Sequence, residues 1–399
     1  MSKSQLILLL PLLSLALLHT VVDTCALLVS PLWTQFESTF QLTGSSLSMI
    51  FIVQSMPTSI SQVVFGYLRD RKASTYLVWL GPLFTVLCLT TIGIADDLFL
   101  LCALLVIGGI GVGAFHPDAA VVAGGMLEGN RTRGLSVFMF GGSLGLAIGP
   151  AISGFVTSQW GLLGLAALAP ILLLVIPVLW WQIKRGLSLE PTTDEPTKKS
   201  LGEMMEGRVG LAVMLLLICS ARLVPNMAMD KVIAFTLDRH GADQMMTGLL
   251  QSVFLTSASV GMFLMAMKFR SGWEKRFMVG CPLLGIPLIC VLGWKDCPLW
   301  LFIGTLIPTG MVLWGTAPAM VSYAQQLFPK GAGLASALTM GMAWGIGGLI
   351  QAPITAYFRS IDEPQAAFFA YTPCLALAAL GAWCLPFRSA DEQQPAETT

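Results

Sequence analysis

Long apolar runs alternate with short polar segments along the whole chain. Runs that can each cross about 30 Å of hydrocarbon as a helix lie near residues 6–33, 43–68, 76–94, 98–122, 134–156 and 161–183, and then near 209–235, 244–267, 277–293, 298–324, 331–357 and 365–386. The first run is too long for a secretory signal, because it continues past His19 and Asp23 to Trp33. The pattern therefore predicts twelve transmembrane helices.

A polar segment separates the two sets of six runs. Residues 184–208 are rich in Pro, Thr and charge and show no apolar periodicity, which is typical of a linker. We predict an all-α polytopic membrane protein with two six-helix bundles, over residues 1–183 and 209–386. The segment 184–208 is the predicted cytoplasmic linker, and 387–399 is a polar cytoplasmic tail.

The two halves resemble each other in sequence, which indicates an internal repeat with an offset of about two hundred residues. Pro117 corresponds to Pro318, and a glycine face recurs in the second half as Gly341, Gly345 and Gly348. In the first half it is the row of Gly141, Gly145 and Gly149, four residues apart, followed by Pro150. Such a face lets another helix approach at backbone distance. Two parallel repeats predict two bundles related by an axis along the membrane normal, with a substrate between them.

Composition agrees with the membrane class. Hydrophobic residues make up 55% of the chain and charged residues 11%, against about 25% charged in soluble domains. The net charge of zero gives no basic field for nucleic acid. The nine cysteines are scattered and never spaced as CxxC, so we predict no disulfide framework, metal site or cofactor. The ATP-binding pattern GxxxxGK[ST] is absent, which leaves an ion gradient as the energy source.

The distribution of Lys and Arg predicts the orientation. With both termini in the cytoplasm, seventeen of the 22 basic residues fall on the cytoplasmic side and three outside. The remaining two, Arg222 and Lys231, lie inside the seventh helix. This bias holds in both halves and predicts a multi-pass protein of the bacterial inner membrane.

Two motifs resemble the major facilitator superfamily. The turn GYLRDRK at 66–72 resembles its signature loop between the second and third helices. The resemblance implies a cytoplasmic gating loop in which Gly66, Asp70 and Arg71 take part. The segment GGSLGLAIGP at 141–150 resembles the glycine-proline motif of its antiporters.

Other segments resemble the fosmidomycin-resistance subfamily of drug efflux proteins. These are His19-x-x-x-Asp23 with Pro31-Leu32, Phe115-His116-Pro117-Asp118, and 323–329. The sequence departs from that subfamily in having Asp at 118 in place of Glu and Gln at 326 in place of an acid. The resemblance implies proton-coupled efflux of a small drug-like compound, and hence a role in antibiotic resistance.

Four ionisable residues are candidates for proton coupling: His19, Asp23, His116 and Asp118. Ionisable groups inside the membrane most often belong to substrate or proton pathways, and an imidazole exchanges protons near neutral pH. His19 and Asp23 are one turn apart on the same helix face. His116 and Asp118 would point apart on a regular helix, although Pro117 distorts it. The structural alternatives are a hydrogen-bonded pair for the first two and a latch from Asp118 to a loop residue such as Arg131.

Arg222 is the main candidate for binding substrate, because it occupies the position in the seventh helix that His19 occupies in the first. A guanidinium stays charged, so it can bind an anion or a carboxylate but cannot carry the proton. Its structural alternative is an ion pair with Asp23 or Asp230. His19, Asp23, Trp314 and Trp344 are further candidates for substrate contacts.

The sequence predicts a monomeric secondary transporter, not an enzyme, which exchanges a small organic compound for protons across the lipid bilayer by rocking of its two halves. One alternative is a proton symporter or facilitator that imports a metabolite. The alternative from another class is a polytopic membrane enzyme that uses His19, Asp23, His116 and Asp118 as acids, bases or metal ligands.

Overall fold

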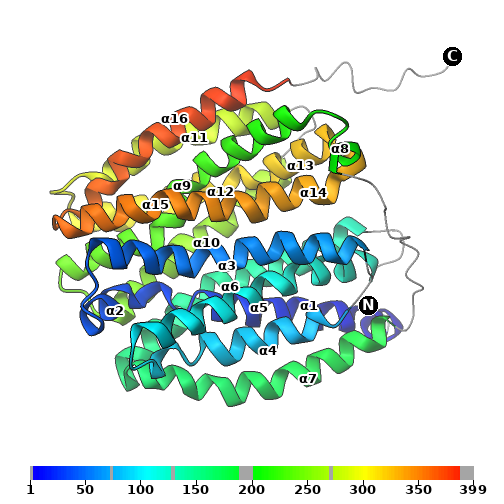
Figure 1. The fold of residues 1–399 in the computed structure, drawn as a ribbon, viewed down its shortest axis with the longest axis horizontal. Coiled ribbons are helices and arrows are strands. Elements are labelled where there is room, and N and C mark those ends of the chain that lie inside the picture. The colour runs from blue at the N-terminus through cyan, green and yellow to red at the C-terminus, as the bar shows by residue number, and fades with distance from the viewer. Residues whose placement is uncertain (1–2, 72–74, 127–130, 188–200, 269–272, 387–399) are drawn as a thin grey trace.

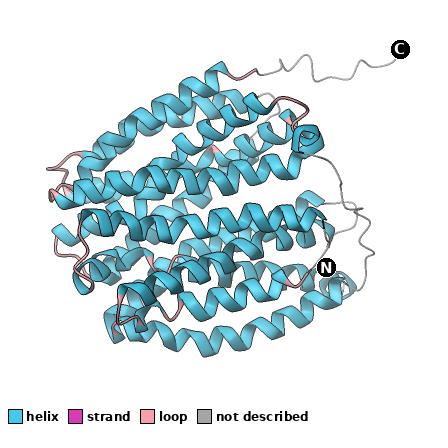
Figure 2. Ribbon diagram, in the orientation of Figure 1, coloured by secondary structure: helices cyan, strands magenta, loops and turns pink. Residues whose placement is uncertain are grey.

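The computed structural model describes residues 3–71, 75–126, 131–187, 201–268 and 273–386, and all elements in these ranges are helices (Figure 2). The first half contains α1 (Lys3–Ala26), η1 (Ser30–Leu32), α2 (Trp33–Thr39), α3 (Gly44–Arg71), α4 (Leu77–Leu89), η2 (Ile92–Ile94), α5 (Leu98–Gly125), α6 (Arg131–Trp160), η3 (Leu162–Ala167) and α7 (Leu168–Leu187). The second half contains α8 (Leu201–Met204), α9 (Val209–Arg239), α10 (Gln244–Lys268), α11 (Glu274–Gly293), α12 (Leu299–Gly315), α13 (Ala317–Leu327), η4 (Pro329–Gly331), α14 (Ala332–Ala337), η5 (Leu338–Met342), α15 (Ala343–Ser360), η6 (Pro364–Ala366) and α16 (Ala367–Cys384).

Twelve helical segments of the described chain are long and apolar enough to cross a membrane, and they lie close to the twelve predicted runs. The predicted all-α polytopic fold is therefore confirmed. Figure 1 shows α1, α4, α5 and α7 on one side of the molecule and α9, α11, α15 and α16 on the other, with α3 beside α15 between them. Residues 188–200 of the predicted linker and the tail 387–399 lie outside the described residues.

Several of the twelve spans are not single regular helices. The first is interrupted after α1 ends at Ala26 and resumes through η1, which contains Pro31. The tenth is divided at Thr316, just before Pro318, and the eleventh contains the π-helical turn η5. By contrast, α5 runs unbroken through Pro117. Irregular backbone inside a membrane has to be buried in protein or to line a polar space.

The glycine row of α6 packs directly against α1. A Cβ atom added to Gly141 or Gly145 would collide with the backbone carbonyl oxygen of Ala16 or Thr20, and one added to Gly149 would lie 2.7 Å from that of Thr24. The two helices therefore match each other at intervals of four residues. Thr20 Oγ1 also donates a hydrogen bond of 2.8 Å to the carbonyl of Gly141. Backbone contact of this kind fixes α1 against α6 with no space for a side chain.

Further along, α6 contacts α10 of the other half. A Cβ atom on Gly154 would collide with the carbonyl oxygen of Gln244, and one on Gly248 would collide with that of Pro150. The amide of Ala151 donates a hydrogen bond of 3.0 Å to Ser252 Oγ. The α6–α10 and α3–α15 pairs are the two extensive helix contacts that join the halves in the described chain.

We expect Gly145→Ala to lower the free energy of unfolding by about 1–3 kcal/mol, because the added methyl group forces α1 and α6 apart. Gly304→Ala is the matched control, since a Cβ atom on Gly304 in α12 meets no atom within 4 Å. The measurement is unfolding of the purified protein in detergent. Equal stability of the two variants would contradict the tight packing of α1 on α6.

Candidate functional site

Two histidines and an aspartate from two helices meet inside the first half. His19 Nε2 lies 3.2 Å from Asp23 Oδ2, and His116 Nε2 lies 3.3 Å from Asp23 Oδ1. The two Nε2 atoms are 3.1 Å apart. Asp23 lies in the last turn of α1, where the first span is interrupted, and His116 comes from α5. We call these three side chains the His-Asp cluster.

Backbone carbonyl groups fix the orientation of both imidazole rings. His19 Nδ1 lies 2.8 Å from the carbonyl oxygen of Phe138, and His116 Nδ1 lies 2.7 Å from that of Val112. Because a carbonyl only accepts, each Nδ1 atom carries a proton and donates it. The ring of Phe138 also stacks on that of His19, with centroids 4.0 Å apart. Both Nε2 atoms are thereby directed at each other and at Asp23.

The His-Asp cluster gathers hydrogen-bond acceptors at short distance. In neutral imidazoles with protonated Nδ1 atoms, both Nε2 atoms present lone pairs, and the carboxylate adds two more acceptors. Three acceptor groups at these separations repel one another unless a proton or a metal ion lies between them. Within the described residues these three side chains form the one group of His, Cys and acidic residues that could hold a metal ion, with ligand atoms within 4.8 Å of one another.

Asp118 lies apart from this cluster, although only two residues separate it from His116. Its Oδ1 atom lies 3.7 Å from Nε of Arg69 at the end of α3, and its Oδ2 atom has no hydrogen-bond partner among the described residues. The carboxylate is 1% exposed. Gly66 belongs to the same helix contact, because a Cβ atom there would lie 3.8 Å from Pro117. The side chains of Asp70, Arg71 and Arg131 lie outside the described residues.

Arg222 forms neither of the ion pairs considered from the sequence. Asp23 belongs to the His-Asp cluster, and Asp230 is bound 3.0 Å from Lys231 Nζ. Arg222 is buried in α9, and its Nη1 atom donates a hydrogen bond of 2.7 Å to the carbonyl of Leu313 in α12. Next to Leu313 is Trp314, whose ring lies edge-on to that of Trp344 with centroids 5.2 Å apart.

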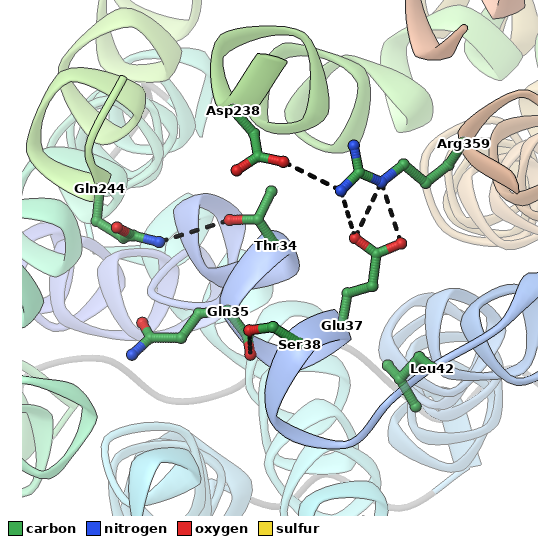
Figure 3. Close-up of a pocket in the computed structure, with 8 residues that line it drawn as sticks. All are labelled: Thr34, Gln35, Glu37, Ser38, Leu42, Asp238, Gln244 and Arg359. Atoms are coloured by element: carbon green, nitrogen blue, oxygen red, sulfur yellow. Dashed lines mark hydrogen bonds and ion pairs between the residues drawn. The ribbon is translucent and has the colours of Figure 1, made fainter. Parts of the chain in front are cut away.

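Charged and aromatic residues connect the halves at the other end of the molecule from Arg69. Arg359 of α15 donates two hydrogen bonds to Glu37 Oε2 of α2, at 2.9 and 2.7 Å, and one of 3.0 Å to Asp238 of α9. They line a pocket of about 650 Å³ together with Thr34, Gln35, Ser38, Leu42 and Gln244 (Figure 3). Outside the membrane spans, a hydrogen bond from Lys295 lowers the pKa of Glu363.

A second contact between the halves lies deeper than this pocket. Trp33 Nε1 donates a hydrogen bond of 3.0 Å to Asp230, and Lys231 Nζ lies 3.3 Å from Gln54 Oε1. Lys231 also lies over the ring of Trp33, 5.0 Å from its centroid. The halves are thus joined through charged groups on this side of the His-Asp cluster.

Sequence reasoning missed four residues of these sites. Phe138 acts through its backbone carbonyl, which leaves no signal in a sequence. Gly142 lies against the cluster, since a Cβ atom there would be 2.8 Å from Asp23 Oδ2, but it is hidden among the neighbouring glycines. The ion pair of Glu37 with Arg359 joins positions 322 residues apart, and only the packed fold brings them together.

Comparison with known proteins gives consistent results. Residues 12–352 match the family model described as Major Facilitator Superfamily. The chain is 26% identical over 343 residues to the fosmidomycin resistance protein of Escherichia coli (strain K12), covering 84% of this chain and 83% of the relative. It is also 26% identical over 373 residues to the uncharacterized MFS-type transporter YfnC of Bacillus subtilis (strain 168), covering 90% of each.

Solved structures resemble the fold. The crystal structure of a bacterial homolog of the human lysosomal transporter Spinster, in an inward-facing and unoccupied conformation, aligns with a TM-score of 0.74 at 12% identity. The alignment covers 96% of this chain and 97% of that one. At such low identity the likeness concerns the fold alone.

The contact of Glu37 with Arg359 can be tested by a double-mutant cycle. We expect the effects of Glu37→Gln and Arg359→Gln on the free energy of unfolding to be coupled by about 1–2 kcal/mol. Either substitution removes the same partly buried carboxylate–guanidinium pair, which is held by more than one hydrogen bond. The Lys295–Glu363 pair, whose side chains are 61% and 39% exposed, serves as the control and should show the weaker coupling. Additive effects at Glu37 and Arg359 would contradict a joint across the halves.

Proposed function

The chain belongs to the major facilitator superfamily, and we propose that it is a monomeric secondary transporter that exports a small organic compound in exchange for protons. The proposed location is the bacterial inner membrane, with both termini in the cytoplasm. The observation that carries the proposal is the convergence of His19, Asp23 and His116 on one point within the membrane-spanning helices. Three acceptor groups aimed at one another form a site that takes up and releases a cation, and a proton gradient supplies that cation.

The proton is shared within the cluster. A proton on one Nε2 atom converts that imidazole to a cation, which donates to Asp23 or to the other ring and removes the repulsion between acceptors. Loss of the proton restores the repulsion, so the unprotonated cluster has to separate, admit water or bind another partner. Because His19 and Asp23 lie on α1 and His116 on α5, protonation changes how strongly these two helices attract each other.

Asp118 is the candidate for the group that receives the proton after the His-Asp cluster. It follows His116 toward the proposed cytoplasmic end of α5, and its Oδ2 atom has no hydrogen-bond partner among the described residues. Arg69 stands 3.7 Å from the other oxygen and neutralises the carboxylate after the proton has left. Gly66, Asp70 and Arg71, which the sequence placed in a turn, lie in the last two turns of α3 and are the proposed cytoplasmic gating residues.

The substrate contacts are proposed on both sides of the central space. Arg222, Trp314 and Trp344 supply them in the second half, and His19 and Asp23 supply them in the first. In this mechanism the Glu37–Arg359 contact and the Trp33–Asp230 contact close the outer side. Both have to open when the halves rock and the substrate leaves.

Export is favoured over import by one relative. The protein of Escherichia coli is named for resistance to a compound, and removal of a compound from the cell is a direct route to resistance.

The rival within transport is a proton symporter or facilitator that imports a metabolite. The rival of another class is a membrane enzyme that uses the cluster and Asp118, and movement of a compound without covalent change would exclude it. A panel of compounds that includes phosphonates, tested for proton release from inverted vesicles, separates export from import.

The proposed orientation predicts which loops an impermeant thiol reagent can reach in intact cells. In a cysteine-free background, a single cysteine between 188 and 200 should stay unlabelled, because the linker is proposed to lie in the cytoplasm. A cysteine at Asp96 or Asp362 should react, because these loops connect the spans at the opposite membrane face. Permeabilised cells give the control, in which all three positions become reactive. Labelling of the linker from outside intact cells would show that the proposed orientation is wrong.

Asp23→Asn should abolish uphill transport driven by a pH gradient, because the amide cannot exchange the proton with His19 and His116. Counterflow between two pools of substrate should continue, since it needs no net proton movement. Asp96→Asn is the control, because it removes an exposed acid outside the spans. Uptake and counterflow are measured on the same reconstituted protein.

Two outcomes of this experiment are decisive. An Asp23→Asn protein that still concentrates substrate against its gradient would exclude Asp23 from coupling. Loss of both uptake and counterflow, together with loss of thermal stability, would instead make Asp23 a structural partner of the two histidines. Gly142→Ala gives an independent check, because its methyl group would lie 2.8 Å from Asp23 Oδ2 and should impair uptake while the carboxylate is kept.

A further inference from the structure

Arg222 carries a buried charge without a counter-ion in the described part of the chain. The residue is 2% exposed and lies in the middle of the seventh span. Its Nη1 atom binds the Leu313 carbonyl, whereas its Nε atom has no hydrogen-bond partner. None of the ion pairs among the described residues includes Arg222. A guanidinium in this position calls for an anion from outside the chain.

Two neutral donors belong to residues that adjoin Arg222 on its helix or its partner Leu313 in the chain. Asn226 is one turn further along α9, on the same helix face as Arg222. It is 5% exposed, and neither atom of its amide has a hydrogen-bond partner. Trp314 follows Leu313, to which Arg222 is bound, and its Nε1 atom is also buried without a partner. Unpaired buried donors are rare in folded proteins because each lost hydrogen bond is unfavourable, so their grouping marks a ligand site.

The surroundings of these donors set the chemical class of the ligand. Arg222 and Lys231 are the buried Lys and Arg residues of the described chain, and Lys231 is paired with Asp230. The rings of Trp314, next to Leu313, and of Trp344 supply apolar surface. Building on the proposed function, we propose that the substrate is an organic monoanion with an aromatic or aliphatic body. Its carboxylate, sulfonate or singly charged phosphonate group binds Arg222, Asn226 and Trp314.

A monoanionic substrate fixes how much charge the transport cycle moves. Export of one monoanion against one entering proton moves two positive charges inward, so the membrane potential drives the cycle as well as the pH gradient. A neutral substrate exchanged for one proton moves one charge. A monoanion imported together with one proton moves none. The ratio of charge to protons therefore separates the three cases.

Binding is tested with four matched naphthalene compounds: 2-naphthoate, 2-naphthalenesulfonate, the neutral 2-naphthamide and the cationic 2-naphthylmethylamine. We expect the purified protein to bind the two anions at least about tenfold more tightly than the other two, and Arg222→Met to remove this preference. Arg208→Gln is the matched control. It removes an exposed arginine of the same region that also donates a 2.7 Å hydrogen bond to a backbone carbonyl, that of Leu327.

Thermal unfolding without ligand provides a second readout. Arg222→Met should unfold at the same temperature as the unmodified protein or higher, because removal of a buried charge with no counter-ion offsets the loss of its hydrogen bond to the Leu313 carbonyl. A lower unfolding temperature would instead make Arg222 structural and overturn the proposal. Asn226→Leu, which removes only an unpaired amide, should keep stability and still weaken 2-naphthoate binding. Unchanged binding in that variant would also overturn the site.

Two further arms identify the occupant and separate this inference from the proposed function. In liposomes of phosphatidylcholine, addition of phosphatidylglycerol should leave 2-naphthoate binding unchanged, and competition by this lipid would assign the site to a lipid headgroup. Current and proton flux are then recorded with 2-naphthoate in proteoliposomes. A ratio of two supports the monoanion, and a ratio of one with the neutral amide as the better substrate overturns it. If the protein binds the anion but shows no coupled flux, the proposed proton-coupled transport is wrong, whereas the proposed anion site is supported.

Discussion

Charge inside a membrane has to be neutralised by a partner, and this constraint organises the whole interior of the protein. Asp23 meets two imidazoles, Asp118 meets Arg69, and Asp230 meets Lys231. His116–Asp23 and Asp118–Arg69 join different helices, whereas His19–Asp23 and Asp230–Lys231 are pairs within one helix. Arg222 is the exception among the described residues, because it has no counter-ion. Its unfilled hydrogen-bonding capacity therefore suits it to a substrate anion. A fixed charge without a partner is unfavourable in a static fold but useful where an anion comes and goes.

The sequence predicts those features of the fold that depend on residues close together in the chain. The twelve spans depend on runs of apolar residues, so their positions could be read directly from the chain. The i, i+4 pairing of His19 with Asp23 is equally local. His116 joins them only because α5 packs beside α1, and a pattern along the chain gives no measure of that packing. The same limit applies to Arg222, for which the sequence left Asp23 and Asp230 open as partners. The fold commits Asp23 to the two histidines and Asp230 to Lys231, and thereby leaves the arginine free of both.

His116 and Asp118 show how a short motif can serve two places. Their side chains diverge from one continuous helix, so that His116 contacts Asp23 and Asp118 contacts Arg69. The motif therefore spans the interval between the His-Asp cluster and the end of α3. A proton that moves from one to the other travels along α5 and does not cross between the halves. This geometry keeps the proposed proton route within the first half and leaves the space between the halves for the organic substrate.

One helix connects that route to the motion of the halves. The carbonyl of Phe138 in α6 holds His19, and Gly142 leaves room for the side chains of His19 and Asp23. One to three turns further on, Gly145 and Gly149 press against the backbone of α1, and beyond them Gly154 presses against α10 of the other half. In the proposed mechanism, a change in the separation of α1 and α5 on protonation is therefore transmitted to a helix whose glycines meet the backbones of α1 and α10 directly. Because contacts between bare backbones cannot be absorbed by rotation of a side chain, a small shift of α1 has to move α6 as a unit, and with it the α6–α10 contact between the halves.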